Sequence, residues 1–172
     1  MIMNTSAKLY SLSFANVKTY LFALLFVAGN IILPQLCHLI PMGGPTLLPI
    51  YFFTLIAAYK FGIRVGLLTA LLSPVVNHLL FGMPAAAVLP AILIKSGLLA
   101  IAASAIARYA KDKVTLGGLL IAVLSYQIIG TAFEWMLCGN FYLAVQDFRM
   151  GVPGMLLQWL GGYFALKAIA NR

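Results

Sequence analysis

The hexapeptide RYAKDK at positions 108–113 separates two long apolar segments and carries three of the eleven Lys and Arg residues of the chain. On both sides of it, basic residues recur at every second connection between apolar segments, whereas the intervening connections hold only Arg149. Cytoplasmic loops concentrate Lys and Arg, so this pattern predicts six membrane crossings with both termini in the cytoplasm. The basic residues of these connections are Lys8, Lys18, Lys60, Arg64, Arg108, Lys111, Lys113, Lys167 and Arg172.

The composition is that of a membrane protein. Hydrophobic residues make up 63% of the chain and charged residues 8%, and the mean hydropathy is +1.04. A soluble domain is about one quarter charged. We therefore expect an all-α, multi-pass protein of the cell (inner) membrane. The 172 residues suffice for one domain of six spans of roughly 20 residues each, which excludes a separate soluble catalytic domain.

The net charge of +8 follows from this topology rather than from nucleic-acid binding, because the basic residues would face anionic inner-leaflet lipids.

The second predicted helix contains Pro49. The third contains Pro74, which is expected to kink the helix or free a carbonyl. Between the last two helices, residues 140–150 predict either a short interfacial helix or an aromatic-belt loop. The predicted helices span about 19–36, 46–61, 65–81, 86–108, 116–138 and 152–168.

Polar residues occur inside the predicted spans, where a charged group costs about 2.5–3.5 kcal/mol and needs a partner or a function. Most of them fall in the middle or outer half of their helices. A proton or ion path would need polar groups at all depths, so the distribution favours a pocket open to the outside, with Trp135, Tyr126, Tyr142 and Trp159 as its apolar walls. The candidate polar contacts are Lys95, Glu134, Asn30, Asn77, His78, Gln127 and Gln158.

Two roles are open for the charged residues Lys95 and Glu134. They are either ligand contacts or a buried ion pair between the fourth and fifth helices, and both roles hold if the pair opens to bind a charged or zwitterionic ligand. His78 is a ligand contact, a helix cap or a packed imidazole. The adjacent Cys37 and His38 do not define a metal site, so no metal or cofactor is expected.

Motifs for catalysis and for nucleotide binding are missing from the sequence. We find no H-E-x-x-H, Walker A, paired intramembrane aspartates or Gly-x-Ser-x-Gly. The chain is therefore not expected to be an enzyme, and ATP-driven work would come from other chains.

Small residues recur at four-residue spacing on the fourth predicted helix, at Ser96, Ala100 and Ser104. Such a stripe allows another helix to approach closely within the membrane. The neighbouring helix belongs either to this chain or to a partner protein.

Six helices in about 170 residues, cytoplasmic termini and an outward polar pocket resemble the substrate-binding S components of energy-coupling factor (ECF) vitamin transporters. The stretch LSPVVNHLLFGMP at positions 72–84, followed by Pro90, is similar to a segment of that family around the third helix and its outer turn. Many members carry an alanine-x-x-x-alanine docking motif on the first helix. Here Ala23 is followed by Val27 instead, so the small residues of the fourth helix are expected to share this contact.

The resemblance implies capture of a small water-soluble vitamin or precursor from the outside. It also implies partners, namely a transmembrane coupling subunit and two ATPase subunits, with Ala23, Ser96, Ala100 and Ser104 facing the coupling subunit. A small structural scaffold of the cell-wall-elongation type, without a ligand, is the alternative function.

Overall fold

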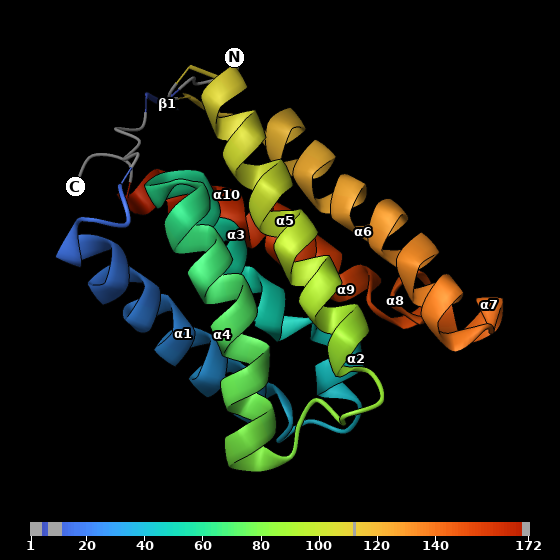
Figure 1. Cartoon of the computed structure of the whole chain (residues 1–172). Helices are drawn as coiled ribbons and strands as arrows, with labels where there is room; N and C mark the ends of the chain where they lie inside the picture. The colour runs from blue at the N-terminus through green and yellow to red at the C-terminus, as the bar shows by residue number, and fades with distance from the viewer. Residues whose placement is uncertain (1–4, 7–11, 112, 170–172) are drawn as a thin grey trace.

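In the computed structural model, which describes residues 5–6, 12–111 and 113–169, the chain is almost entirely helical. Within these described residues, four helices are long and apolar enough to cross a membrane, and they lie alongside one another (Figure 1). Each matches one of the predicted spans, so the sequence prediction of an all-α membrane protein is confirmed for these four segments. They are α1 (Val17–Cys37), α4 (Ile63–Phe81), α5 (Leu89–Tyr109) and α6 (Leu116–Cys138).

The predicted helix over 46–61 is wrong as a single continuous element. The chain instead forms α2 (Gly43–Leu47), a 3₁₀ turn η1 (Pro49–Tyr51) and α3 (Phe52–Phe61). The break lies at Leu48, whose φ of 47° is left-handed and cannot continue a right-handed helix. Pro49 follows with no backbone N–H and a fixed φ, so it starts the next element.

The predicted sixth helix is a continuous helical path with an irregular centre. It consists of α9 (Val152–Leu156), the π-helical turn η2 (Leu157–Gly161) and α10 (Gly162–Ile169). Before it, two short helices occupy the predicted interfacial segment, α7 (Phe141–Ala144) and α8 (Gln146–Met150). The helical prediction for 140–150 therefore holds in part, with a break at Val145.

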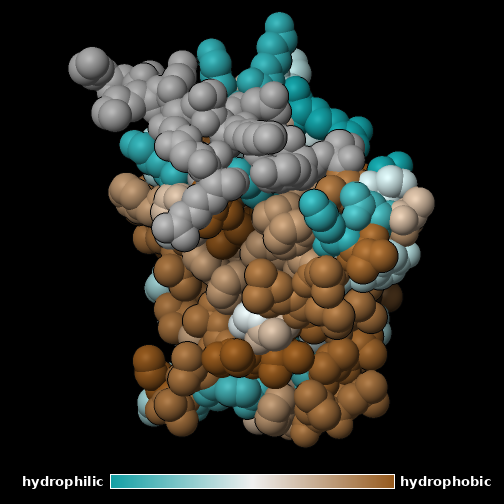
Figure 2. All heavy atoms as spheres, turned by 90° about the vertical axis from the view of Figure 1, so that its left-hand side faces the viewer, coloured by the Kyte–Doolittle hydropathy of each residue, from teal (hydrophilic) through white to brown (hydrophobic). Residues whose placement is uncertain are grey.

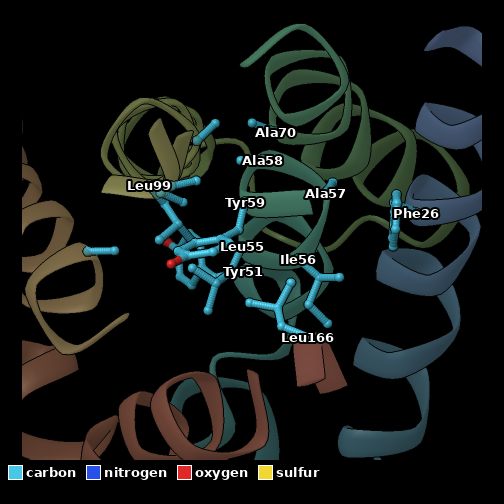
Figure 3. Close-up of a cluster of buried hydrophobic side chains, with 14 of the residues drawn as sticks. Phe26, Tyr51, Leu55, Ile56, Ala57, Ala58, Tyr59, Ala70, Leu99 and Leu166 are labelled. Carbon is cyan, nitrogen blue, oxygen red and sulfur yellow. The ribbon is translucent and has the colours of Figure 1, made fainter. Parts of the chain in front are cut away.

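Helix α3 is the centre of the bundle. Eight successive residues of it, from Thr54 to Phe61, are buried. Figure 3 shows Leu55 of α3 together with Leu99 of α5 and Leu166 of α10, and the three side chains belong to the same buried cluster. A helix that is surrounded by protein on all sides has no polar face, and this explains why α3 is apolar all round.

The outer surface of α1 is apolar. Leu21, Leu24 and Leu25 are 60%, 60% and 63% exposed. Figure 2, which views this side of the molecule, shows a broad hydrophobic band with hydrophilic side chains gathered toward one end and a smaller hydrophilic group at the other. Exposed leucines in such a band fit contact with lipid.

The chain connections fall at two opposite ends of the bundle. At one end, the strand β1 (Thr5–Ser6) pairs antiparallel with β2 (Lys113–Val114), in the connection between α5 and α6. Arg64, in the first turn of α4, donates to the carbonyl of Leu12 at 3.0 Å, so Leu12 and the α3–α4 connection share this end. Helices α2, α7 and α8 lie at the other end (Figure 1).

Candidate ligand-binding site

A cavity of about 310 Å³ lies at the end of the bundle opposite the β1–β2 pair. It is bounded by the last turns of α1, by α2 and η1, by the turn between α4 and α5, and by parts of α5, α6 and α8. Its volume is at the lower limit of typical small-ligand sites. Most of the lining is apolar, and the polar residues that line it are Gln35, His38, Tyr51, Asn77, Lys95, Glu134, Gln146 and Asp147.

An ion cluster forms the polar wall of this cavity. Lys95 of α5 places its Nζ 2.5 Å from Oε2 of Glu134 on α6 and 2.8 Å from Oδ2 of Asp147 on α8. The Lys95 side chain is 2% exposed, whereas the two carboxylates are 20% and 16% exposed. A buried ammonium is stable only when opposite charges and hydrogen bonds compensate for the lost hydration. The cluster therefore ties three elements together at the cavity.

A glycine of α6 makes room for the Lys95 side chain. A Cβ built at Gly130 would lie 2.5 Å from Cγ of Lys95, closer than real carbon atoms approach. The stem of the lysine therefore runs directly over the backbone of α6. This close approach brings its ammonium to the carboxylate of Glu134, one helical turn farther along α6.

Asp147 is a residue of the candidate site that sequence analysis missed. The sequence predicts Glu134 as a possible partner of Lys95 and does not single out Asp147, which belongs to the segment between the last two predicted helices. A usable signal was the scarcity of acids, because the whole chain has three Asp and Glu residues. Glu134 lies in the last turns of the fifth predicted helix and Asp147 lies beyond its end, so both are close to the outer end of this helix.

A second polar network joins α1, α3 and α4 beside the cavity. Asn77 of α4 donates to the carbonyl of Asn30 at 2.8 Å. That carbonyl lies four residues before Pro34, which has no N–H to pair with it. The side chain of Asn30 accepts from the backbone N–H of Phe53, one of the unpaired donors at the start of α3, and donates to Thr54 at 3.0 Å.

This network changes the role of two predicted contacts. Asn77 borders the cavity, but both of its polar groups already have protein partners, since its Oδ1 also accepts from Gln35. Asn30 is fully buried and does not line the cavity. Both side chains therefore satisfy backbone groups that the prolines and helix ends leave open.

The predicted contacts Gln127 and Gln158 do not line the cavity but form hydrogen bonds beside it. The hydroxyl of Tyr126 donates to Gln158 Oε1 at 2.8 Å and accepts from Gln127 Nε2 at 3.2 Å. Gln158 Nε2 donates to the carbonyl of Leu48 at 3.5 Å, at the break between α2 and η1. The three side chains are buried and hold the turn that carries Tyr51 into the cavity lining.

The remaining predicted residues lie outside the cavity lining. His78 Nδ1 is 2.8 Å from the carbonyl of Pro84, so it braces the turn at the rim. Trp135 is 50% exposed and packs edge-on against Phe141. Trp159 donates from Nε1 to the carbonyl of Leu116, toward the opposite end of the bundle. The predicted aromatic wall is therefore not built from these two tryptophans, and Tyr51 lines the cavity instead.

The stripe of small residues is used within this chain. Ser96, Ala100 and Ser104 of α5 are 0%, 0% and 5% exposed, and Ala23 of α1 is 2% exposed. Residues buried in this way pack α5 and α1 against their neighbours within this chain. The expected contact of these four residues with a partner is not supported by their burial.

Two further observations limit the chemistry of the site. Among the described residues, no group of three or more His, Cys, Asp or Glu side chains is arranged to hold a metal ion. Lys95 itself occupies the point between the two carboxylates.

Comparison with family models, curated proteins and solved structures gives no match to this chain.

Proposed function

We propose that this chain is the substrate-binding membrane subunit, the S component, of an ECF-type uptake system. In this proposal it captures a small water-soluble vitamin or related micronutrient from outside the cell. The observation that carries the proposal is the cavity of about 310 Å³ with the Lys95–Glu134–Asp147 cluster in its wall. Ligand sites combine an apolar lining with a few convergent polar groups in this way.

The orientation of the cavity is part of the proposal. The cavity lies at the end opposite to Arg64, Lys111 and Lys113, which belong to the basic connections. Because Lys and Arg concentrate on the cytoplasmic side, the cavity opens outward and both termini lie inside. The two interrupted segments, 43–61 and 152–169, complete six crossings. Irregular backbone within a membrane is tolerated where protein or a cavity surrounds it, as at Leu48.

The energy for uptake comes from other chains in this proposal. The sequence has no nucleotide-binding motif, so binding takes place without ATP and release to the cytoplasm requires a transmembrane coupling subunit with two ATPase subunits. The protein binds its ligand and carries out no covalent chemistry.

One observation favours the alternative of a structural membrane protein without a ligand. Lys95 already has two carboxylate partners, so the cluster satisfies a buried charge without any ligand. In that case the combined Lys95→Met and Glu134→Gln changes alter only stability. In the S-component proposal the same changes also abolish ligand binding.

Reconstitution separates the two functions. The molecule released from the purified, denatured protein is identified by mass spectrometry, and its labelled form is offered to proteoliposomes that contain only this chain. We expect ATP-independent binding and no accumulation in the lumen. Accumulation by this chain alone would refute the ECF-type assignment, whereas the absence of any bound molecule would favour the structural alternative.

A further inference from the structure

The charges of the cavity wall do not balance. Two carboxylates, Glu134 and Asp147, face a single ammonium, Lys95, which leaves a formal charge of −1 when His38, the histidine of the lining, is counted as neutral. The nearest other cation along the chain, Arg149, is not part of the lining. It is held over the ring of Tyr142, with its guanidinium 3.7 Å from the ring centroid, and it donates to that residue's hydroxyl. An uncompensated negative charge beside an apolar cavity favours a cation.

Acceptor atoms in the cavity remain open as well. Only Oε2 of Glu134 and Oδ2 of Asp147 contact Lys95, and the second oxygen of each carboxylate accepts no hydrogen bond from any residue that the structure describes. Tyr51 is 2% exposed and lines the cavity, with its ring against Tyr126 at a centroid distance of 5.2 Å. Its hydroxyl has no hydrogen-bond partner among the described residues. The hydroxyl is therefore open to a molecule in the cavity. The fully buried side-chain atoms without a partner among the described residues are instead Ser96 Oγ, Gln127 Oε1 and Thr131 Oγ1.

Building on the proposed function, we infer that the ligand of this cavity carries a protonated amine or another cationic nitrogen. The cationic nitrogen donates to the open oxygens of Glu134 and Asp147, and the Tyr51 hydroxyl supplies a further acceptor. Lys95 acts as a positioning residue that holds both carboxylates at the wall. The apolar remainder of the lining, including Ile92 and Val88, receives an uncharged body of small size.

Competing ligand charges are disfavoured by the same geometry. An anion would reach the remaining N–H of Lys95 only beside two carboxylates, against a net negative charge. A divalent metal ion would have to displace the Lys95 ammonium from between them. A neutral ligand would leave the excess charge uncompensated in a low-dielectric setting.

Three probes of similar shape and different charge test the inference. They are phenethylamine, 2-phenylethanol and 3-phenylpropanoate, each titrated into the purified protein in detergent micelles, with the thermal unfolding midpoint as the readout of binding to the folded state. We expect phenethylamine to raise the midpoint of the wild-type protein and the other two to have little effect. A midpoint raised most by 2-phenylethanol or by 3-phenylpropanoate would overturn the inference, and so would no response to any of the three.

Variants of the Lys95–Glu134–Asp147 cluster test whether the preference for a cation depends on the two carboxylates. Asp147→Asn should weaken phenethylamine binding about tenfold to a hundredfold, the effect of one hydrogen bond to a charged group. Glu134→Gln combined with Asp147→Asn leaves only the Lys95 charge and should reverse the preference toward 3-phenylpropanoate. Arg149→Gln is the matched control, because it removes a nearby charge outside the lining, and it should bind as the wild type does. An unchanged order of the probes in a folded double variant would also overturn the inference.

The outcomes separate this inference from the proposed function. If an anionic or neutral molecule co-purifies with the protein and occupies the cavity, the cationic assignment fails while the function as a binding subunit stands. If no molecule co-purifies and no probe binds, both fail.

Discussion

Introducing a methyl group at position 130 should separate Lys95 from its carboxylates. Gly130→Ala places a Cβ where only 2.5 Å separates it from Cγ of Lys95, an atom too close to the backbone of α5 to move freely. Either α5 and α6 shift apart, or the Lys95 side chain changes its rotamer. In the second case its ammonium loses contact with Glu134 and Asp147. Overpacking of this kind costs about 1–3 kcal/mol. The gain in helix propensity from Gly to Ala offsets about 1 kcal/mol of it.

The sign of the effect should depend on the residue at position 95. In the wild-type background we expect Gly130→Ala to destabilise the protein by about 0–2 kcal/mol. In a Lys95→Ala background the Cγ is gone, and the same change should stabilise it by about 1 kcal/mol. The coupling free energy between the two sites is then about 1–3 kcal/mol, within the usual range for residues in contact.

Equilibrium unfolding of the four proteins in mixed micelles with sodium dodecyl sulfate measures this cycle. Each single variant serves as the control for the other, because the coupling is a difference between the two backgrounds. Additivity within about 0.5 kcal/mol would mean that the two residues do not touch and would refute the description of the cavity wall.

Three further predictions concern topology and packing. In a background without the two native cysteines, an impermeant thiol reagent added to intact cells should label Asn140→Cys but not Lys111→Cys; the reverse would contradict the outward orientation. Asn77→Leu leaves the carbonyl that Pro34 exposes without a donor and should lower the free energy of unfolding by about 1–3 kcal/mol, part of which Pro34→Ala should restore; no recovery in the double variant would argue against this pairing. Ala100→Leu should destabilise the bundle by about 1–3 kcal/mol, as seen in its thermal midpoint; an unchanged midpoint together with weaker co-purification of a partner would return this stripe to a docking role.

The long helices could be predicted closely from the sequence. The predicted bounds of α6, 116–138, are those of the structure, because its ends carry local signals. Thr115 caps the first turn by accepting from the N–H of Gly118 at 3.1 Å, and Gly139 ends the helix with a φ of 65°. Where an apolar run is long and its capping residues are adjacent in sequence, the bounds of the helix can be predicted from periodicity and composition.

Other features depend on tertiary contacts that no local pattern reveals. The left-handed turn at Leu48 is held by Gln158, which lies 110 residues farther along the chain. The contact between Asp147 and Lys95 requires α8 to fold back over α5. The sequence marks the polar residues within the spans, but it cannot separate those that line the cavity from those that satisfy freed backbone groups, as Asn30 does.

Native mass spectrometry of the protein released from gentle detergent tests the central claim most directly. The proposal that this chain binds a small solute beside Lys95 predicts a wild-type mass above that of the bare chain by one small molecule, and the loss of this added mass in a monodisperse Lys95→Met variant. Bare chain in both samples, or an added mass that survives in the Lys95→Met variant, would contradict it.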